Sequence, residues 1–305
     1  MSSAITYEAS MLLELIPWFQ DRYSRLWQEM RSCCHADTTA TPNPYHLEND
    51  CWSHTMMVCK MAQYFEEPLS VQIAALLHDI GKPAVRSPNP GNHHVSFRAH
   101  DRISAWLALP ILAELREEKK IDEDMSAEIF VLILLHQLLH TPHDEETLWR
   151  LFRPFPRWLT PLAALERCDA LGSFSTRPTW NPQRSETLLS FGKRIAREYT
   201  PSSDGRAVTQ WLVTPFERLA TGWYEALPER QRTAIHYEPG FIHASHRESA
   251  MKNMPPSQCH RAIILLPLKI TMDEMEALLE KDFERFLRFD LPMGDSFDEV
   301  AIRFV

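Results

Sequence analysis

The adjacent pair His78 and Asp79 is the part of the sequence with the clearest chemical meaning. It follows the apolar run Ala74-Ala75-Leu76-Leu77 and precedes Ile80-Gly81-Lys82-Pro83, whose Gly and Pro end a helix. An imidazole beside a carboxylate offers a borderline nitrogen and a hard oxygen from one rigid point, which suits Zn, Mn, Fe, Ni or Co better than Ca. The dipeptide alone is weak support, because His100-Asp101 and His143-Asp144 repeat it.

Further residues with metal-binding side chains lie on predicted helices, mostly among apolar neighbours: His54, His100, His136 and Asp169. A single helical histidine is more often hydrogen-bonded within a core than bound to a metal. Many ionisable groups buried without a shared purpose would leave polar atoms unpaired, at a large cost in free energy. A metal cluster removes this cost, because each side chain becomes a ligand or supports one. The set therefore predicts a metal site.

Helices are expected to position these residues, because apolar-periodic segments are long and only 8 of the 305 residues are glycine. In the first 180 residues we expect helices over 7–30, 54–65, 68–81, 100–118, 129–139 and 159–171. Asn49 or Asp50 caps the second, Pro68 fits the first turn of the third and Ser126 caps the fifth. Pro110 must kink or split the fourth.

The character of the sequence changes after Pro182. We expect helices over 186–199 and 206–227, the second disturbed by Pro215, and a helix from a cap at Thr271 to Phe289. Strands are expected over 232–237, 262–268 and 300–305. The predicted fold class is mainly α, with a small α+β C-terminal region. The predicted domains are an N-terminal helix on the core (1–43), the metal-binding domain (44–180) and an accessory region of unknown role (181–305).

Composition limits the functional classes. The formal net charge of −9 gives no global electrostatic footprint for long nucleic acid, although a local basic patch could hold a nucleotide or an RNA end. The 6 cysteines form no Cys-x-x-Cys pair and indicate reduced thiols. No apolar run is long enough to cross a bilayer, and the N-terminus lacks the basic region of a secretory signal. We therefore expect a cytoplasmic protein without a membrane partner.

The motifs resemble the HD-domain metal-dependent phosphohydrolase superfamily over residues 44–175. The sequence around His54 and Lys82 is most similar to that of the HD domains joined to bacterial tRNA nucleotidyltransferases and to polynucleotide-kinase RNA-repair proteins. Two positions depart from the pattern, because Ala99 stands where Gly is common and Asp101 where Glu is frequent. The segments that carry the resemblance are His46-Leu47-Glu48-Asn49-Asp50-Cys51-Trp52-Ser53-His54-Thr55, Leu76-Leu77-His78-Asp79-Ile80-Gly81-Lys82-Pro83, Phe97-Arg98-Ala99-His100-Asp101, Leu135-His136 and Cys168-Asp169-Ala170-Leu171-Gly172.

The resemblance implies an HD helical bundle and a divalent-metal cofactor, as two ions of Mn, Ni, Co, Fe, Mg or Zn. One ion is held by His54, His78, Asp79 and Asp169. Asp79 bridges to a second ion held by His100 and His136. If the second ion is absent, His100 and His136 would bind phosphate directly. Asp79 and Lys82 are the residues expected to serve catalysis.

Other basic residues are candidates for substrate contact. Lys82 is expected at the mouth of the site, where it would neutralise charge on a phosphoryl group, unless it only complements a helix C-terminus. Arg86 and Arg98 could clamp phosphate or lie solvated on the surface, and His94 sits in a polar loop suited to substrate. Several histidines stay open: His140 as a supporting or alternative ligand, His143 as a surface residue, and His243 and His246 without a third ligand.

The predicted function is metal-dependent hydrolysis of a phosphomonoester or a 2′,3′-cyclic phosphodiester on a nucleotide or RNA terminus. The small phosphorylated substrate is the expected partner. One alternative is hydrolysis of nucleoside triphosphates or dinucleoside polyphosphates, which the products would distinguish. Another is a non-catalytic HD scaffold that binds a nucleotide signal or a protein, which tight binding without turnover would favour.

Overall fold

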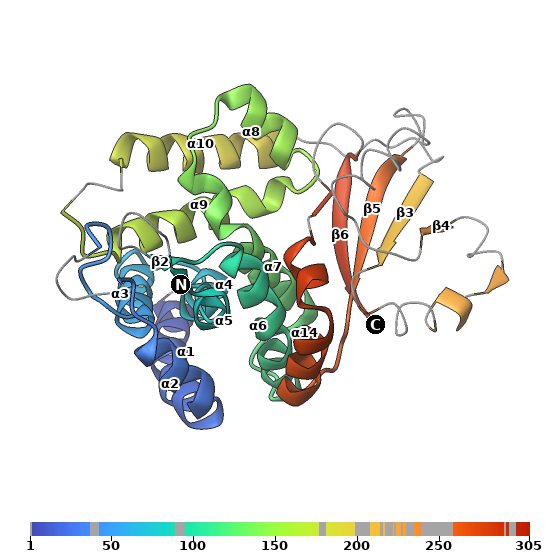
Figure 1. Cartoon of the computed structure of the whole chain (residues 1–305). Helices are drawn as coiled ribbons and strands as arrows, with labels where there is room; N and C mark the ends of the chain where they lie inside the picture. The colour runs from blue at the N-terminus through green and yellow to red at the C-terminus, as the bar shows by residue number, and fades with distance from the viewer. Residues whose placement is uncertain are drawn as a thin grey trace. The chain divides into compact units, whose positions relative to one another are not determined.

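The computed structural model describes residues 2–36, 43–88, 95–176, 181–198, 208–213, 235–238, 259–289, 291–292 and 297–305, with single positions between 216 and 229 (Figure 1). For 2–10, 208–213, 235–238 and 259–260 only the backbone is described. The chain divides into two compact units. Unit 1 comprises Met1–Ala108, Asp124–Thr141 and Thr160–Phe191, and unit 2 comprises Leu109–Glu123, Pro142–Leu159 and Gly192–Val305.

Unit 1 is helical and contains every residue of the predicted metal site that the structure describes. Apolar side chains at helical spacing form its core, and all nine residues of α4 are buried between neighbouring helices. Its elements, some of which continue into unit 2, are α1 (Ser2–Arg22), α2 (Ser24–Ser32), α3 (Cys51–Tyr64), α4 (Leu69–Leu77), α5 (Lys82–Val85), β1 (Ser87–Pro88), β2 (Val95–Ser96), α6 (His100–Glu117), α7 (Glu123–Leu135), the 3-10 helix η1 (His136–His140), α9 (Pro156–Leu171) and α10 (Pro182–Glu198).

Two glycines allow the close contacts that position the site. A Cβ at Gly81 would lie 2.5 Å from the backbone nitrogen of Ser104, and the Gly81 N–H donates to Ser104 Oγ at 2.9 Å. The turn after His78 and Asp79 is thereby held against α6. A Cβ at Gly172 would lie 2.7 Å from the backbone nitrogen of Val58, so the end of α9 packs directly on α3. Both positions require the missing side chain of glycine.

Unit 2 contains a parallel four-stranded sheet in the order β4-β3-β5-β6 (Figure 1). Ala262 to Leu266 are buried in the central strand β5, as expected for a parallel sheet with covered faces. Thr271 caps α14 through a capping box with Glu274. The elements are α8 (Glu145–Phe152), β3 (Val208–Val213), β4 (Ile235–Glu238), β5 (Cys259–Leu266), α14 (Met272–Leu287) and β6 (Glu299–Phe304).

The predicted fold class is confirmed: the protein is mainly α, with a small sheet toward the C-terminus. The caps at Asp50 and Thr271 are also confirmed, since the Asp50 side chain accepts from the Ser53 N–H. Strands lie close to the three segments predicted as strands. No helix among the described residues is long and apolar enough to cross a membrane.

Several element predictions were wrong. The segment 206–227 does not form one helix, because Val208–Val213 is strand β3, paired with β4 and β5 on its two sides. Its β-branched and aromatic residues fit a sheet, and pairing on both sides outweighs helical periodicity. The helix predicted from Ser126 starts earlier, at Glu123, and gives way to the 3-10 helix at His136. For Pro110, which was expected to kink or split its helix, the structure excludes a split, because α6 is continuous through it.

Two more boundaries differ from expectation. The N-terminal segment forms α1 and α2, because Tyr23 has a non-helical backbone with φ −116° and ψ 44°. Pro68 is the N-cap of α4 rather than part of its first turn, and this helix ends at Leu77. His78 to Gly81 then form turns before α5, so the His-Asp pair stands on a corner and not inside a helix.

Candidate metal centre

The structure brings the predicted ligands together from separate elements of unit 1. His54 lies in α3, His78 caps the C-terminus of α4 and Asp79 follows it. His100 begins α6, His136 begins η1, and Asp169 lies near the end of α9. Each of these six residues is at most 6% exposed. The cluster is therefore a buried arrangement of imidazoles and carboxylates.

Asp79 lies between two pairs of histidines. Its Oδ2 is 3.2 Å from His78 Nε2 and 3.6 Å from His54 Nε2. Its Oδ1 is 3.2 Å from His100 Nε2 and 4.0 Å from His136 Nε2. Each oxygen therefore faces its own pair, which is the geometry that a bridging carboxylate needs.

Asp169 joins the first of these pairs. Its Oδ1 lies 2.8 Å from His54 Nε2 and 3.8 Å from His78 Nε2. Its Oδ2 contacts His140 Nε2 at 3.0 Å. The role of His140 was left open in the sequence analysis. In the structure it contacts the second oxygen of the Asp169 carboxylate and supports the orientation of that side chain.

Backbone carbonyls fix the direction of three of the imidazoles. The Nδ1 atoms of His78, His100 and His136 lie 2.9, 2.7 and 2.7 Å from the carbonyls of Ala75, Phe97 and Ile133. Only Nδ1–H can donate to a carbonyl, so Nε2 of each neutral ring presents a lone pair to the cluster. This is the usual way in which a protein orients metal-binding histidines.

The inward-facing atoms fit a cation. Nε2 of His100 and His136 are 3.1 Å apart, with both Nδ1 atoms committed to carbonyls. Nε2 of His78 and Oδ1 of Asp79 are buried and make no hydrogen bond among the described residues. Acceptors that face acceptors in a buried site are costly unless a positive group lies between them. A nitrogen and carboxylate donor set suits a divalent transition metal.

Lys82 lies inside the cluster and not at its mouth. Its side chain is 7% exposed, and Nζ lies 2.7 Å from Asp79 Oδ2. Burial alone would lower the pKa of Lys82, but Asp79 raises it above the ordinary value. Burial alone would raise the pKa of Asp79, but His78 and Lys82 hold it well below the ordinary value. The lysine is therefore a fixed positive charge beside the bridging carboxylate.

The protonation of two histidines differs sharply. Burial would lower the pKa of His54, but hydrogen bonds to Asp169 and Glu48 raise it to about 9. Burial, with the nearby His100 and His78, lowers the pKa of His136 well below the ordinary value. In the absence of a cation, a proton on His54 thus compensates the carboxylates, and a bound metal would displace it.

The predicted substrate contacts are only partly brought to the site. Arg86 donates to the carbonyls of Cys34 and Ala36, at 3.1 and 3.3 Å. Arg98 is exposed in the turn before α6, and His143 is half-buried at the start of the segment before α8. His94, His243 and His246 lie outside the described residues.

The structure adds residues that sequence reasoning missed. Glu48 Oε1 lies 3.2 Å from His54 Nδ1, on the side of the ring away from the cluster. A carboxylate behind a metal-binding histidine holds its orientation and raises its basicity. Glu48 precedes His54 by six residues, outside any helical spacing, so only the fold places it there. Ala99 has φ 60°, which explains why a glycine would be favoured before His100.

The chain is similar to a described family and to several known proteins. Residues 51–148 match the family model of the HD domain. The multifunctional CCA protein of Paracidovorax citrulli is 28% identical over 200 residues, which cover 60% of this chain and 46% of that protein. The multifunctional CCA protein of Ralstonia nicotianae is 32% identical over 132 residues, or 42% and 25% of the two chains.

A third relative is the CC-adding tRNA nucleotidyltransferase of Thermus thermophilus, 27% identical over 124 residues, or 40% of this chain and 27% of that protein. The chain thus matches half or less of the length of these relatives. HD domains bind divalent metals, and the clusters of histidine and aspartate described above could hold them. Residues 51–148 thus match the HD domain, in agreement with the resemblance found in the sequence.

Proposed function

We propose that the protein is a metal-dependent phosphohydrolase that acts on a phosphomonoester or a 2′,3′-cyclic phosphodiester of a nucleotide or RNA terminus. The observation that carries the proposal is Asp79, whose two oxygens face two different histidine pairs. His54, His78, Asp79 and Asp169 would hold one ion. Asp79, His100 and His136 would hold a second.

The residues of the chain have distinct tasks in this proposal. Bound divalent ions would supply a water of lowered pKa and would polarise the phosphoryl oxygens. The carbonyls of Ala75, Phe97 and Ile133 keep the histidine lone pairs directed inward, so the ligands need no reorganisation. Lys82 keeps its proton and places a positive charge where negative charge develops on the phosphoryl group.

The substrate class rests on the charge of the chain and on the names of its relatives. A net charge of −9 favours a small phosphorylated group over a long polyanion. Two kinds of relative are named as a CCA protein and a CC-adding tRNA nucleotidyltransferase. We therefore expect an RNA 3′ end to be the best substrate, and a mononucleotide can represent this end in an assay. The chain matches only part of those proteins, so their nucleotidyl transfer is not carried over.

The test is a substrate panel assayed with purified protein after addition of Mn, Ni, Co, Mg or Zn. It includes 2′,3′-cyclic nucleotides, 2′- and 3′-mononucleotides, nucleoside triphosphates and a dinucleoside polyphosphate. We expect hydrolysis of a cyclic or monophosphate nucleotide that depends on metal, and its loss in H78A and D79A proteins that remain folded. H143A is the matched control and keeps its activity. Full turnover in D79A, or no turnover with any metal and substrate, would refute the proposal.

A further inference from the structure

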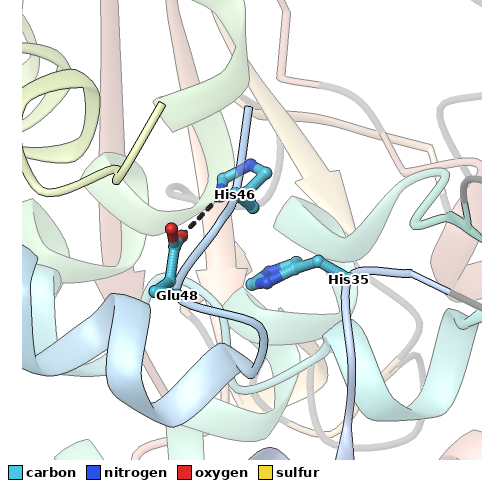
Figure 2. Close-up of side chains that lie close together, drawn as sticks. All are labelled: His35, His46 and Glu48. Carbon is cyan, nitrogen blue, oxygen red and sulfur yellow. Dashed lines mark hydrogen bonds and ion pairs between the residues drawn. The ribbon is translucent and has the colours of Figure 1, made fainter. Parts of the chain in front are cut away.

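A second group of metal-binding side chains lies behind the HD cluster. It consists of His35, in the segment after α2, and of His46 and Glu48, in the segment before α3. Figure 2 shows the carboxylate of Glu48 beside the ring of His46, with the ring of His35 close to both. One ligand atom from each residue lies within 4.8 Å of the others. None of the three was among the residues predicted to bind metal.

The spacing within this group matches that of the HD cluster. His46 Nδ1 lies 2.7 Å from Glu48 Oε1, and His54 Nε2 lies 2.8 Å from Asp169 Oδ1. Two ligands at the tetrahedral angle on a zinc ion, with bonds of about 2.1 Å, lie roughly 3.4 Å apart. The His46 and Glu48 atoms would therefore separate by about 0.7 Å to bind one ion. The His35 and His46 rings are nearly parallel, with centroids 4.3 Å apart.

The buried position of His35 is costly without a ligand. The residue is fully buried, and its Nδ1 makes no hydrogen bond among the described residues. Its Nε2 lies 3.6 Å from Cys51 Sγ, at the distance of a weak hydrogen bond. An unsatisfied buried polar atom costs about 1–3 kcal/mol. An ion bound to Nδ1 would remove this cost.

The donor set suits a cation. His35 and His46 offer imidazole nitrogens and Glu48 offers a carboxylate oxygen, and one such atom from each residue lies within 4.8 Å of the others. Nitrogen and carboxylate donors together suit a divalent transition metal.

We propose that His35, His46 and Glu48 form a further metal site, distinct from the HD centre, that binds a transition-metal ion such as Zn²⁺. Two imidazoles and one carboxylate are a known zinc donor set, and they leave coordination positions open. The His46 side chain is 24% exposed, whereas that of Glu48 is only 4% exposed, so His46 lies on the side open to solvent.

Glu48 connects this site to the HD centre. Its Oε1 lies 3.2 Å from His54 Nδ1, and its Oε2 accepts from the Phe174 N–H at 3.0 Å. An ion held by Glu48 would therefore bind beside the ring of His54 and near the chain that leaves α9. The competing interpretation is that Glu48 only orients His54 and His46, without a metal. The two differ in the number of ions that the protein binds.

The experiment measures Zn²⁺ bound to chelator-stripped full-length protein, by calorimetric titration and elemental analysis after desalting. The key variant is H46N, because the asparagine amide can still donate to Glu48 from the position of Nδ1 while the zinc ligand is lost. We expect H46N to bind one equivalent less than the wild type. H143N, which changes a histidine outside both clusters, keeps the wild-type stoichiometry. Equal stoichiometry in H46N and the wild type would overturn the proposal and leave Glu48 as a supporting residue only.

A second pair of variants separates this site from the HD centre. D79A removes the carboxylate that both halves of the HD centre share. We expect D79A to retain one equivalent of Zn²⁺ and the double variant D79A/H46N to retain none. If D79A does not fold, as judged by circular dichroism, H136N replaces it. We then expect the double variant H136N/H46N to bind one equivalent of Zn²⁺ less than H136N. Absence of residual zinc in a folded D79A protein would count against the site even if the phosphohydrolase proposal holds.

Discussion

Lys82 Nζ lies 2.7 Å from Asp79 Oδ2, and both side chains are buried. The contact places a permanent positive charge next to the carboxylate that faces both halves of the metal centre. A buried ion pair of this kind is expensive to form, so a functional reason for it is worth testing.

The first prediction concerns K82M. Loss of one positive group that stabilises the transition state typically lowers kcat by about 10²–10³-fold. The metal ligands are untouched, so the metal content should stay at the wild-type value. Steady-state kinetics on the best substrate of the panel, together with elemental analysis, measures both. Wild-type kcat in a metal-loaded K82M protein would show that Lys82 is a structural partner of Asp79 only.

The second prediction concerns Gly81, which presses the corner after Asp79 against α6. In G81A the new Cβ would meet the backbone nitrogen of Ser104 at 2.5 Å. Overpacking of this kind costs about 1–3 kcal/mol of the free energy of unfolding. We also expect weaker metal binding, because His78 and Asp79 must shift. Urea denaturation and metal titration measure the two effects.

Gly222 provides the control for this substitution, because nothing lies within 4 Å of a Cβ at that position. G222A should be at least as stable in urea as the wild type, because position 222 is helical and alanine favours a helix more than glycine does. If G81A were as stable as G222A and bound metal equally well, the close contact between the corner and α6 would not matter for the site.

The third prediction concerns Ala99, whose φ is 60°. A non-glycine residue in the left-handed region costs about 1–2 kcal/mol of stability, and glycine avoids this strain. Part of the gain is offset, because glycine gives the unfolded chain more conformational entropy. A99G should therefore raise the free energy of unfolding by roughly 0.5–1 kcal/mol. A127G, inside α7, should lower it instead. If A99G were less stable than the wild type in urea titrations, the backbone at Ala99 would not be strained.

The fourth prediction concerns pH and the buried His35. Its pKa falls to about 2 in the folded protein, mainly through burial, whereas an exposed histidine titrates near 6.5. Below pH 6.5, His35 therefore binds a proton in the unfolded chain but not in the folded protein. The contribution to stability is present above pH 6.5 and is lost as the pH falls toward the folded value. At pH 5 the loss is about 2 kcal/mol.

The comparison of wild type and H35N isolates this term in metal-free protein. His54 acts in the opposite direction, because its pKa is raised to about 9 and its contribution is lost as the pH rises through that value. H35N keeps His54, so the difference between the two proteins should report His35 alone. We expect the wild type to lose more stability than H35N between pH 7 and pH 5. Identical losses would mean that His35 takes up a proton in the folded state.

The sequence was informative wherever a local rule decides the structure. Asp50 and Thr271 could be predicted as caps, because each forms a side-chain hydrogen bond with a nearby backbone N–H. The residues of the HD cluster could be predicted as metal ligands, because they are histidines and aspartates. The strand Val208–Val213 could not be predicted, because strands β4 and β5, distant in sequence, determine its state. The His35, His46 and Glu48 group was missed for a similar reason. Only the fold brings His35 next to residues that follow it by more than ten positions.

The electron paramagnetic resonance spectrum of the Mn²⁺-loaded protein tests the bridging role of Asp79 most directly. Two ions that share one carboxylate lie about 3.5–4 Å apart and couple their spins. We predict a spin-coupled signal in the wild type that disappears in a folded D79A protein. A spectrum of isolated Mn²⁺ ions from the fully loaded wild type would contradict a two-metal centre built on Asp79.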